Sequence, residues 1–195
     1  MKPIENYENM EAKGTGDFVP LTLGGHVCII KKAYISETTT CKEQLCLELD
    51  IAEDGEFKDY YQKQFDNSTK KDKKWGCIYR QLTQESPEYF KGMITAIENS
   101  NPGFKFNWDE NQLVGKKVGG VFGLEEYQKQ DGKIGTITKC VRLRSTDKVK
   151  DAQIPSVRLL NKSLVSYDEY MKEKETINQF TNGQVTNFDD DDLPF

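Results

Sequence analysis

The sequence has a single histidine, His26, among 195 residues, and this scarcity excludes most catalytic and metal chemistry. Zinc sites and activated Ser or Cys nucleophiles usually need histidine in a defined arrangement. The five cysteines are an odd number without a CxxC pair, and no phosphate-binding GxxxxGK[ST] loop occurs. We therefore expect reduced thiols, no metal, no cofactor and no enzymatic activity. A magnesium-dependent nuclease built on Glu48, Asp50 and Asp59 is a distant alternative, because these carboxylates cluster only weakly.

Long apolar runs are also missing, and none approaches the roughly 20 residues that a membrane-spanning helix needs. The first residues, MKPIENYENMEAKG, are charged where a secretory signal would be apolar. We therefore expect no membrane partner and a cytoplasmic protein. The hydrophobic content of 36% can supply one modest core, so one domain with extensions is expected.

Charge is unevenly distributed along the chain, whose net charge is -5. Residues 151–195 hold 9 acids and 4 bases, whereas residues 20–150 hold 21 bases and 19 acids. The acidity therefore belongs to the C-terminal quarter, and the overall balance does not exclude an anionic ligand for the middle of the chain.

Basic and aromatic residues are interleaved in KKDKKWGCIYR, residues 70–80. Ammonium and guanidinium groups neutralise phosphates while flat rings stack on exposed bases, so this composition suits a single-stranded nucleic acid. The simpler alternative is a solvated lysine loop whose Trp75 and Tyr79 return to the core. The stretch taken alone favours this simpler alternative.

Alternation of apolar and polar residues predicts strands over 26–35 and 43–52. In the second strand, one face is predicted to be buried and consists of Leu45, Leu47, Leu49 and Ile51. The residues between them are expected to face solvent: Cys46, Glu48 and Asp50. A turn signal at 53–56 precedes a third predicted strand over 57–65. Its buried face would hold Phe57, Tyr61 and Phe65, leaving Tyr60 on the other face beside Lys58 and Gln62.

The stretch SPEYFKGMITAIENSNPG, residues 86–103, gives the strongest helix signal in the chain. Ser86 suits the N-cap, Pro87 the first helical position, and an apolar stripe follows. Residues 115–128 and 133–145 predict a hairpin that turns at 130–132. One face of its second strand is predicted to hold Ile137, Val141 and Leu143, and the other Thr138, Cys140, Arg142 and Arg144.

Three strands, a helix and two strands form the order of an OB-fold, a five-stranded Greek-key barrel with one helix between its third and fourth strands. A small α+β domain with a helix across an open sheet fits the same order. We place the OB-fold domain at 20–150, after an N-terminal extension at 1–19. An exit segment and short helix follow at 151–180, and a mobile linker with an acidic tip at 181–195.

The chain ends in NFDDDDLPF, and this ending resembles the acidic tip of bacterial single-stranded-DNA-binding proteins. The body is similar to phage-type members of that family from Gram-positive hosts through KWGCIYR, FKGMITAIENSNPGF, LVGKKVGGVFGLEEY and VRLRSTDKV. The resemblance implies an OB-fold that coats single-stranded DNA with little sequence preference, in a bacterial or phage-infected host cytoplasm. It also implies a tail that recruits replication, recombination or repair proteins. The body is longer and the linker shorter than in well-known members, so a homo-oligomer stays an open question.

Strand faces and composition select the residues expected to contact DNA. They are Lys58, Tyr60, Lys70, Lys71, Lys73, Lys74, Trp75, Tyr79, Arg80, Lys139, Arg142 and Arg144. The tip expected to bind partner proteins comprises Asp189, Asp190, Asp191, Asp192, Leu193, Pro194 and Phe195. In this tip, the apolar residues at the end would anchor it to a partner protein, and the acids would steer it toward a basic rim on that partner. The competing hypothesis is a replication or recombination adaptor whose body binds protein instead of DNA, which the near-neutral body charge favours.

Overall fold

One sheet of seven strands dominates the computed structural model, which describes residues 19–52 and 55–180. The strands are β1 (Gly24–Glu37), β2 (Glu43–Ile51), β3 (Ile78–Leu82), β4 (Lys117–Gln128), β5 (Ile134–Arg144), β6 (Val157–Arg158) and β7 (Leu164–Val165). The α-helices are α1 (Tyr60–Asn67), α2 (Pro87–Ser100), α3 (Thr146–Val149) and α4 (Tyr167–Phe180). Two 3-10 helices are η2 (Gly55–Phe57) and η3 (Glu110–Leu113). The expectation of a mainly β protein is confirmed.

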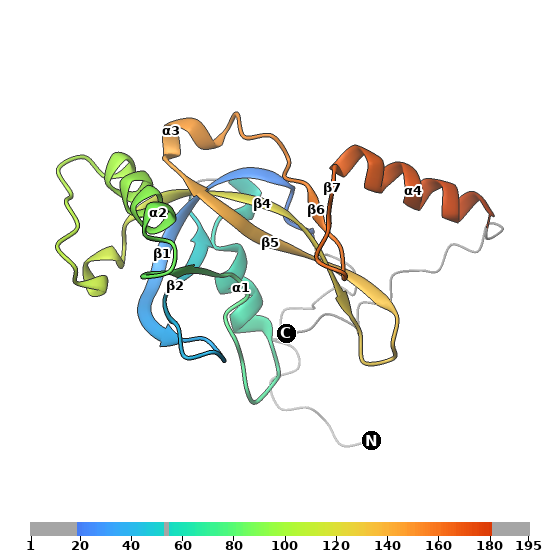
Figure 1. Ribbon diagram of the computed structural model, residues 1–195, viewed down its shortest axis with the longest axis horizontal. Coiled ribbons are helices and arrows are strands. Elements are labelled where there is room, and N and C mark those ends of the chain that lie inside the picture. The colour runs from blue at the N-terminus through green and yellow to red at the C-terminus, as the bar shows by residue number, and fades with distance from the viewer. Residues whose placement is uncertain (1–18, 53–54, 181–195) are drawn as a thin grey trace, which may run out of the picture.

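The sheet runs in the order β3-β2-β1-β4-β6-β7, and β5 also pairs with β4. Every pairing is antiparallel except that of β4 with β6. The sheet is open: β3 and β5 approach each other, with the Cys77 thiol against the backbone of Cys140, yet no ladder joins these two strands. Figure 1 shows α2 at one end of the molecule and α4 at the other.

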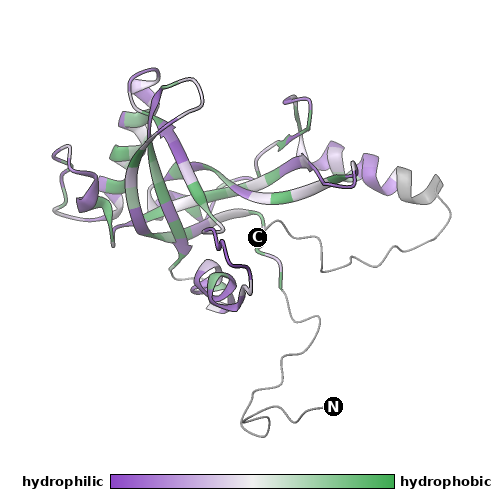
Figure 2. Ribbon diagram, turned by 90° about the horizontal axis from the view of Figure 1, so that it is seen from below, coloured by the Kyte–Doolittle hydropathy of each residue, from purple (hydrophilic) through white to green (hydrophobic). Residues whose placement is uncertain are grey.

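The core lies between the inner face of the sheet and the helices α1 and α2. The predicted buried face of β2 is confirmed, since these residues are at most 1% exposed: Leu45, Leu47, Leu49 and Ile51. Met93 and Ile97 of α2 and Phe122 of β4 pack against them. Figure 2 shows hydrophobic residues along the strands, whereas the described part of α4 is largely hydrophilic. Apolar burial on this scale is the main stabilising contribution to the fold.

The opposite face of β2 is less exposed than its sequence predicts. Cys46 and Asp50 are 1% and 0% exposed, so the expectation that they face solvent is wrong, while Glu48 is half-buried. Ser36 of β1 covers Cys46, with its hydroxyl oxygen 3.2 Å from the thiol sulfur. Asp50, one residue before the end of β2, is buried by the start of α1, whose backbone N–H groups donate to it.

The third strand lies at Ile78–Leu82, so its predicted position at 57–65 is wrong. That segment instead contains the last residue of η2 and most of α1. Phe57, Tyr61 and Phe65 are four residues apart, a spacing that fits one face of a helix as well as one face of a strand. Tyr61 is buried in the core, where its ring stacks on that of Phe122 at a centroid distance of 6.4 Å.

Asp50 of β2 supplies the hydrogen-bond acceptors at the start of α1. Its Oδ1 accepts from the backbone N–H groups of Ile51 and Tyr61, both at 2.9 Å, and its Oδ2 accepts from Gln62 N–H at 3.3 Å. Asp59, at the N-cap position, has a left-handed backbone and makes no side-chain cap. Burial raises the pKa of Asp50, and the three backbone donors oppose that rise. The first turn of α1 therefore depends on a residue of the sheet.

The predicted helix at 86–103 and the hairpin after it are both present. α2 begins at Pro87, with Ser86 at the N-cap position but without a side-chain cap. The β4–β5 hairpin turns where Lys129 N–H donates to the Lys133 carbonyl at 2.8 Å.

An irregularity in the hairpin reverses part of the predicted face of β5. Val121 lies opposite Arg142 while Phe122 lies opposite Cys140, so Val141 has no register partner. Val141 is 41% exposed and Cys140 packs on the core, the reverse of their predicted placement. A bulge of this kind shifts the alternation of inward and outward side chains by one position, and no pattern in the sequence of β5 predicts it.

The segment after β5 folds back against β4. A Cβ at Gly119 would lie 2.5 Å from Cβ of Val149, so the glycine lets α3 approach the sheet closely. Val157 of β6 is fully buried, and Tyr170 of α4 donates its hydroxyl to Glu126 of β4 at 3.2 Å. The chain after β5 thus contributes β6 and β7 to the sheet and continues into the helix α4.

The acidic tip and the predicted linker, at 181–195, lie outside the described residues, as do residues 1–18. Within the described ranges, no helix has both the length and the apolar content to cross a bilayer.

Asp50→Ala is expected to lower the free energy of unfolding by about 1–3 kcal/mol, because buried backbone donors lose their acceptor. Urea titration followed by circular dichroism measures the change. Asp59→Asn is the matched control: asparagine tolerates the left-handed backbone and no cap is lost, so a change within about 0.5 kcal/mol is expected. Equal losses in the two variants would contradict the capping role of Asp50.

Candidate nucleic-acid interface

Strands β1, β2 and β3 place two rows of side chains on the face of the sheet that points away from the core. Tyr34 pairs in register with Cys46, and Cys46 pairs with Arg80. In the adjacent row Lys32 pairs with Glu48, and Glu48 with Ile78. We name these six residues the β1–β3 outer face. Arg80 and Lys32 are exposed, and Tyr34 is half-exposed between them.

Contacts on this outer face link an aromatic ring to two cations. The Lys32 Nζ lies 5.3 Å from the centroid of the Tyr34 ring, within the range of a cation–π interaction. The pKa of Tyr34 lies above its ordinary 10.0, first because of burial and then because of the Cys46 thiol and the Glu48 carboxylate, while Arg80 lowers it. Lys32 thus contacts the Tyr34 ring, and Arg80 lies in the same cross-strand row, close enough to act on the phenol electrostatically.

A change of partner along β1 leaves this face beside an unpaired strand edge. β1 pairs with β4 only from Gly24 to Ile29, whereas its pairing with β2 runs on to Glu37. The register of the β1–β2 pairing shifts between Ile30 and Lys32. Beyond Ile30, no described strand lies on the β4 side of β1.

The basic loop between α1 and β3 lies mostly in solvent. Its exposed lysines are Lys70, Lys71, Lys73 and Lys74. Lys73 Nζ lies 5.5 Å from the centroid of the Phe65 ring and donates to the Asp66 carbonyl at 3.5 Å. This loop leads directly into β3, so it delivers positive charge to the end of the strand that carries Arg80.

The three aromatic residues predicted to stack on bases are all half-buried against the core. The Trp75 indole N–H donates to the Leu49 carbonyl at 2.7 Å, and the Tyr60 hydroxyl accepts from Leu21 N–H at 3.1 Å. Tyr79 alternates with Arg80 and points to the inner face, where burial raises its pKa to about 12. The packing matches the simpler interpretation of the basic stretch, and their role in DNA binding stays a prediction.

The remaining predicted cations lie on other elements. Lys58 is exposed just before α1, and Lys139 of β5 forms an ion pair with Glu125 at 3.1 Å. Arg142 and Arg144 are exposed on β5, the strand that comes near β3. The pairing shown for the sheet does not bring them into the rows of the β1–β3 outer face.

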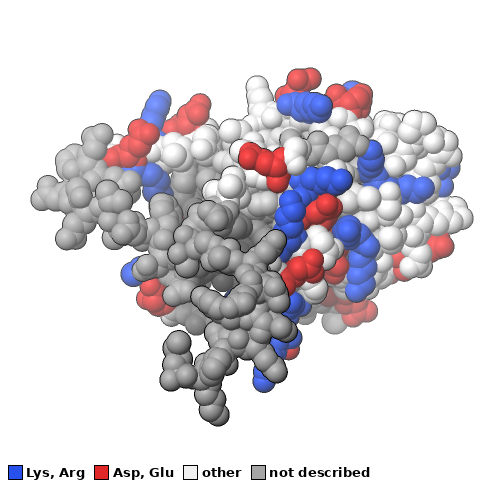
Figure 3. Space-filling model, turned by 180° about the vertical axis from the view of Figure 1, so that it is seen from behind, with Lys and Arg blue, Asp and Glu red and all other residues white. Residues whose placement is uncertain are grey.

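Sequence reasoning missed Lys32 and Tyr34, although a signal was present. Both residues belong to the strand predicted at 26–35, and their spacing of two places them on one face. The missing information was the position of β3, because the third strand was predicted at 57–65 and not over the residues that include Arg80. In Figure 3, Lys and Arg side chains gather near the middle of the described surface with acidic side chains among them.

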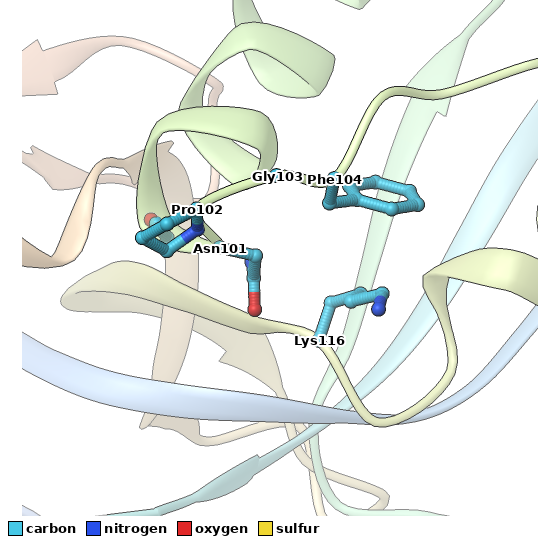
Figure 4. A pocket seen from close by; sticks show the side chains of 6 residues that line it. Asn101, Pro102, Gly103, Phe104 and Lys116 are labelled. Atoms are coloured by element: carbon cyan, nitrogen blue, oxygen red, sulfur yellow. The ribbon is translucent and has the colours of Figure 1, made fainter.

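A surface pocket lies between the C-terminal end of α2 and the start of β4 (Figure 4). Lys116 faces Phe104 across it, with Nζ 4.7 Å from the ring centroid. Asn101 uses its side chain to join α2 to β4, since it donates to the carbonyls of Ile97 and Lys117 and accepts from Lys117 N–H. This pocket therefore serves helix anchoring and offers a cation beside a ring.

In the described part of the chain, the histidine and one of the candidate carboxylates are engaged in contacts that hold the fold together. His26 is buried, with its Nε2 2.8 Å from the Thr22 carbonyl oxygen, and Asp50 is committed to α1. Among the described residues, no group of three or more His, Cys, Asp or Glu side chains has a metal-binding arrangement.

A scan against protein-family models finds no match, and a search of curated proteins finds no significant relative.

Arg80→Ala is expected to raise the pKa of Tyr34 further, because a neighbouring positive charge stabilises the phenolate. Glu48→Gln is the matched opposite change and is expected to lower that pKa. An NMR titration of the tyrosine Cζ signals, with Tyr34→Phe to assign the resonance, measures both shifts. An unchanged titration in both variants would show that these groups do not face one another.

Proposed function

We propose that the protein binds single-stranded DNA with little sequence preference and recruits other proteins through its C-terminal tip. The observation that carries the proposal is the β1–β3 outer face, where Tyr34 has Lys32 beside it on β1 and shares a cross-strand row with Arg80 through Cys46. A half-exposed ring flanked by cations offers one surface for a base and two charges for the adjoining phosphates.

Single strands fit this arrangement better than duplexes. Bases in a duplex are stacked on one another, so their faces do not reach a tyrosine on a sheet surface. A protein that reads the major groove usually inserts an exposed, basic recognition helix, and the described chain has no such helix. One side of α2 is buried, and its exposed side carries both positive and negative charges, as Glu88 and Lys91 show.

The strand order supports an OB-fold as the finer interpretation of the open sheet. The first five strands neighbour one another as β3-β2-β1-β4-β5, and α2 connects β3 to β4. OB-folds bind oligonucleotides on the face formed by their second and third strands, which is where Arg80 and Cys46 lie. In this chain α1 and the strands β6 and β7 would be additions to that core.

The tip adds the recruiting role. Four acids followed by Leu193, Pro194 and Phe195 combine long-range electrostatic steering with an apolar anchor, and a purely solubilising end has no use for the anchor. The partners proposed are replication, recombination and repair proteins, in keeping with the family that the tip resembles. We also propose that the protein is not an enzyme.

The adaptor alternative keeps the tip but gives the body a protein ligand. Two observations favour it: positive and negative side chains are mixed on the surface in Figure 3, and the predicted stacking rings are half-buried. A titration with a labelled oligonucleotide separates the two functions directly.

The full-length protein is expected to bind oligo-dT far more tightly than duplex DNA of equal length. Affinity should fall with salt, with a slope of about -0.7 per phosphate contact on single strands. Arg80→Ala should weaken binding and make the slope shallower by about 0.7. Fluorescence anisotropy at several salt concentrations measures both quantities.

Lys172→Ala is the matched control for this experiment, since it removes an exposed base from α4. This helix lies at the end of the molecule opposite to α2 in Figures 1 and 2. The control substitution should leave affinity and slope unchanged. Arg142→Ala and a combined Lys73→Ala, Lys74→Ala variant test β5 and the basic loop in the same way. Equal affinity for duplex and single strand, or no binding at low salt, would reject the proposal in favour of the adaptor.

Deletion of residues 187–195 is expected to preserve DNA binding and to abolish partner recruitment. Phe195→Ala should lose most of the recruitment with all four acids intact, because a buried aromatic anchor dominates a small interface. A pulldown of host replication and recombination proteins with the three forms measures this. If all three capture the same proteins, the tip is only a solubilising end.

A further inference from the structure

Three aromatic rings form a cluster on the surface beside α2. Trp108 lies nearly parallel to Phe90 of α2, with an interplanar angle of 16° and a centroid distance of 6.2 Å. Phe106 contacts both rings, at 6.4 Å from Phe90 and 6.0 Å from Trp108. We name these three residues the aromatic cluster. Phe90 and Phe106 also pack on the core, so they form a fixed support under the indole.

The position of Trp108 costs stability in two ways. Its side chain is 82% exposed, the highest value for any large apolar residue in the described chain. Its backbone has a φ of 72°, in the left-handed region that bulky side chains rarely adopt. Strain of this kind persists where surrounding structure enforces it and is frequent at binding sites. The fold therefore holds a flat indole face toward solvent, although the ring is apolar and the backbone conformation is unfavourable.

The chain that follows the aromatic cluster runs to the unpaired edge of β1. The Gly115 N–H donates to the Ile30 carbonyl at 2.8 Å, and Ile30 N–H donates to the Lys116 carbonyl at 2.9 Å. Both bonds lie just before Lys32, where the β1–β3 outer face begins. Lys116 lies over the Phe104 ring between the two sites. Backbone contacts thus connect the cluster to the proposed DNA site through a segment that carries a cation.

We infer that Trp108 is a second base-stacking position for the same single strand, reached by DNA that extends beyond the β1–β3 outer face. The inference rests on the proposed function. One face of the indole is already stacked on Phe90, and the opposite face is free to take a base.

Charge beside Trp108 is mixed, so the inferred contact rests on stacking and not on neutralisation of a phosphate. Lys105 is 83% exposed and pairs with Glu98 at 2.9 Å. The Asp109 carboxylate is turned to the Asn111 N–H at 3.0 Å, where it caps η3. The cluster presents one flat ring beside the site proposed for DNA, a geometry that suits stacking on a nucleobase.

The test compares the full-length protein with Trp108→Asn across a series of oligo-dT lengths. Asparagine tolerates the left-handed backbone, so the thermal midpoint should be unchanged or higher. Short oligonucleotides that occupy only the β1–β3 outer face should bind both forms equally. Above a threshold length the variant should bind about 5-fold to 100-fold more weakly, as expected for loss of one stacked base.

Tyr89→Ala is the matched control, because Tyr89 is a neighbouring aromatic that is 69% exposed on α2 and lies outside the aromatic cluster. It should leave binding unchanged at every length. Equal affinity of Trp108→Asn and the unaltered protein at all lengths would overturn the inference. An equal loss at all lengths, with a lowered thermal midpoint, would overturn it in favour of a structural role. Failure of the unaltered protein to bind any oligonucleotide would reject the proposed function itself, and the inference with it.

Discussion

The loss of a neighbour halfway along β1 is the constraint on which the candidate interface depends. β4 pairs with β1 from Gly24 to Ile29 and β2 pairs with it from Cys28 to Glu37, so the two pairings overlap only at Cys28 and Ile29, and the rest of the strand beyond them is held by β2 alone. The register shift between Ile30 and Lys32 marks that change. A strand paired on both sides and covered by a helix has little surface to offer a ligand. Because β1 no longer pairs with β4 beyond Ile29, Lys32 and Tyr34 lie on an open part of the sheet. The segment after α2 lies beside this part of β1.

Much of the fold could be predicted from the sequence, because its hydrophobic pattern matches its secondary structure. The alternation in β2, the capping signals of α2 and the turn before β5 each follow local rules, and each element is where those rules place it. The errors have physical causes that are not local. Apolar residues four positions apart fit a helix and a strand, and the acceptors of Asp50 that stabilise the first turn of α1 lie outside the segment. The bulge opposite Phe122 depends on the partner strand, so no pattern in β5 could reveal it.

The candidate site was harder to predict than the fold, since it is made by neighbours in the sheet instead of neighbours in the sequence. The sequence placed Arg80 in the basic stretch at 70–80. In the sheet it lies in one row with Tyr34, which is 46 positions earlier in the numbering and is separated from it by β2. Composition drew attention to Trp75 and Tyr79, which are aromatic and adjacent to lysines, yet both pack on the core. Exposure, which composition does not contain, distinguishes Trp108 from Trp75.

The dependence of α1 on Asp50 has a consequence for the order in which the chain folds. An eight-residue helix has little stability of its own, and its own N-cap residue makes no side-chain hydrogen bond. Its first turn gains acceptors only when β2 is already in place, eleven positions back along the chain from Tyr61. We therefore expect α1 to form after the β1–β2 hairpin, as a late closure of the core by Tyr61 and not as a nucleus around which the strands assemble.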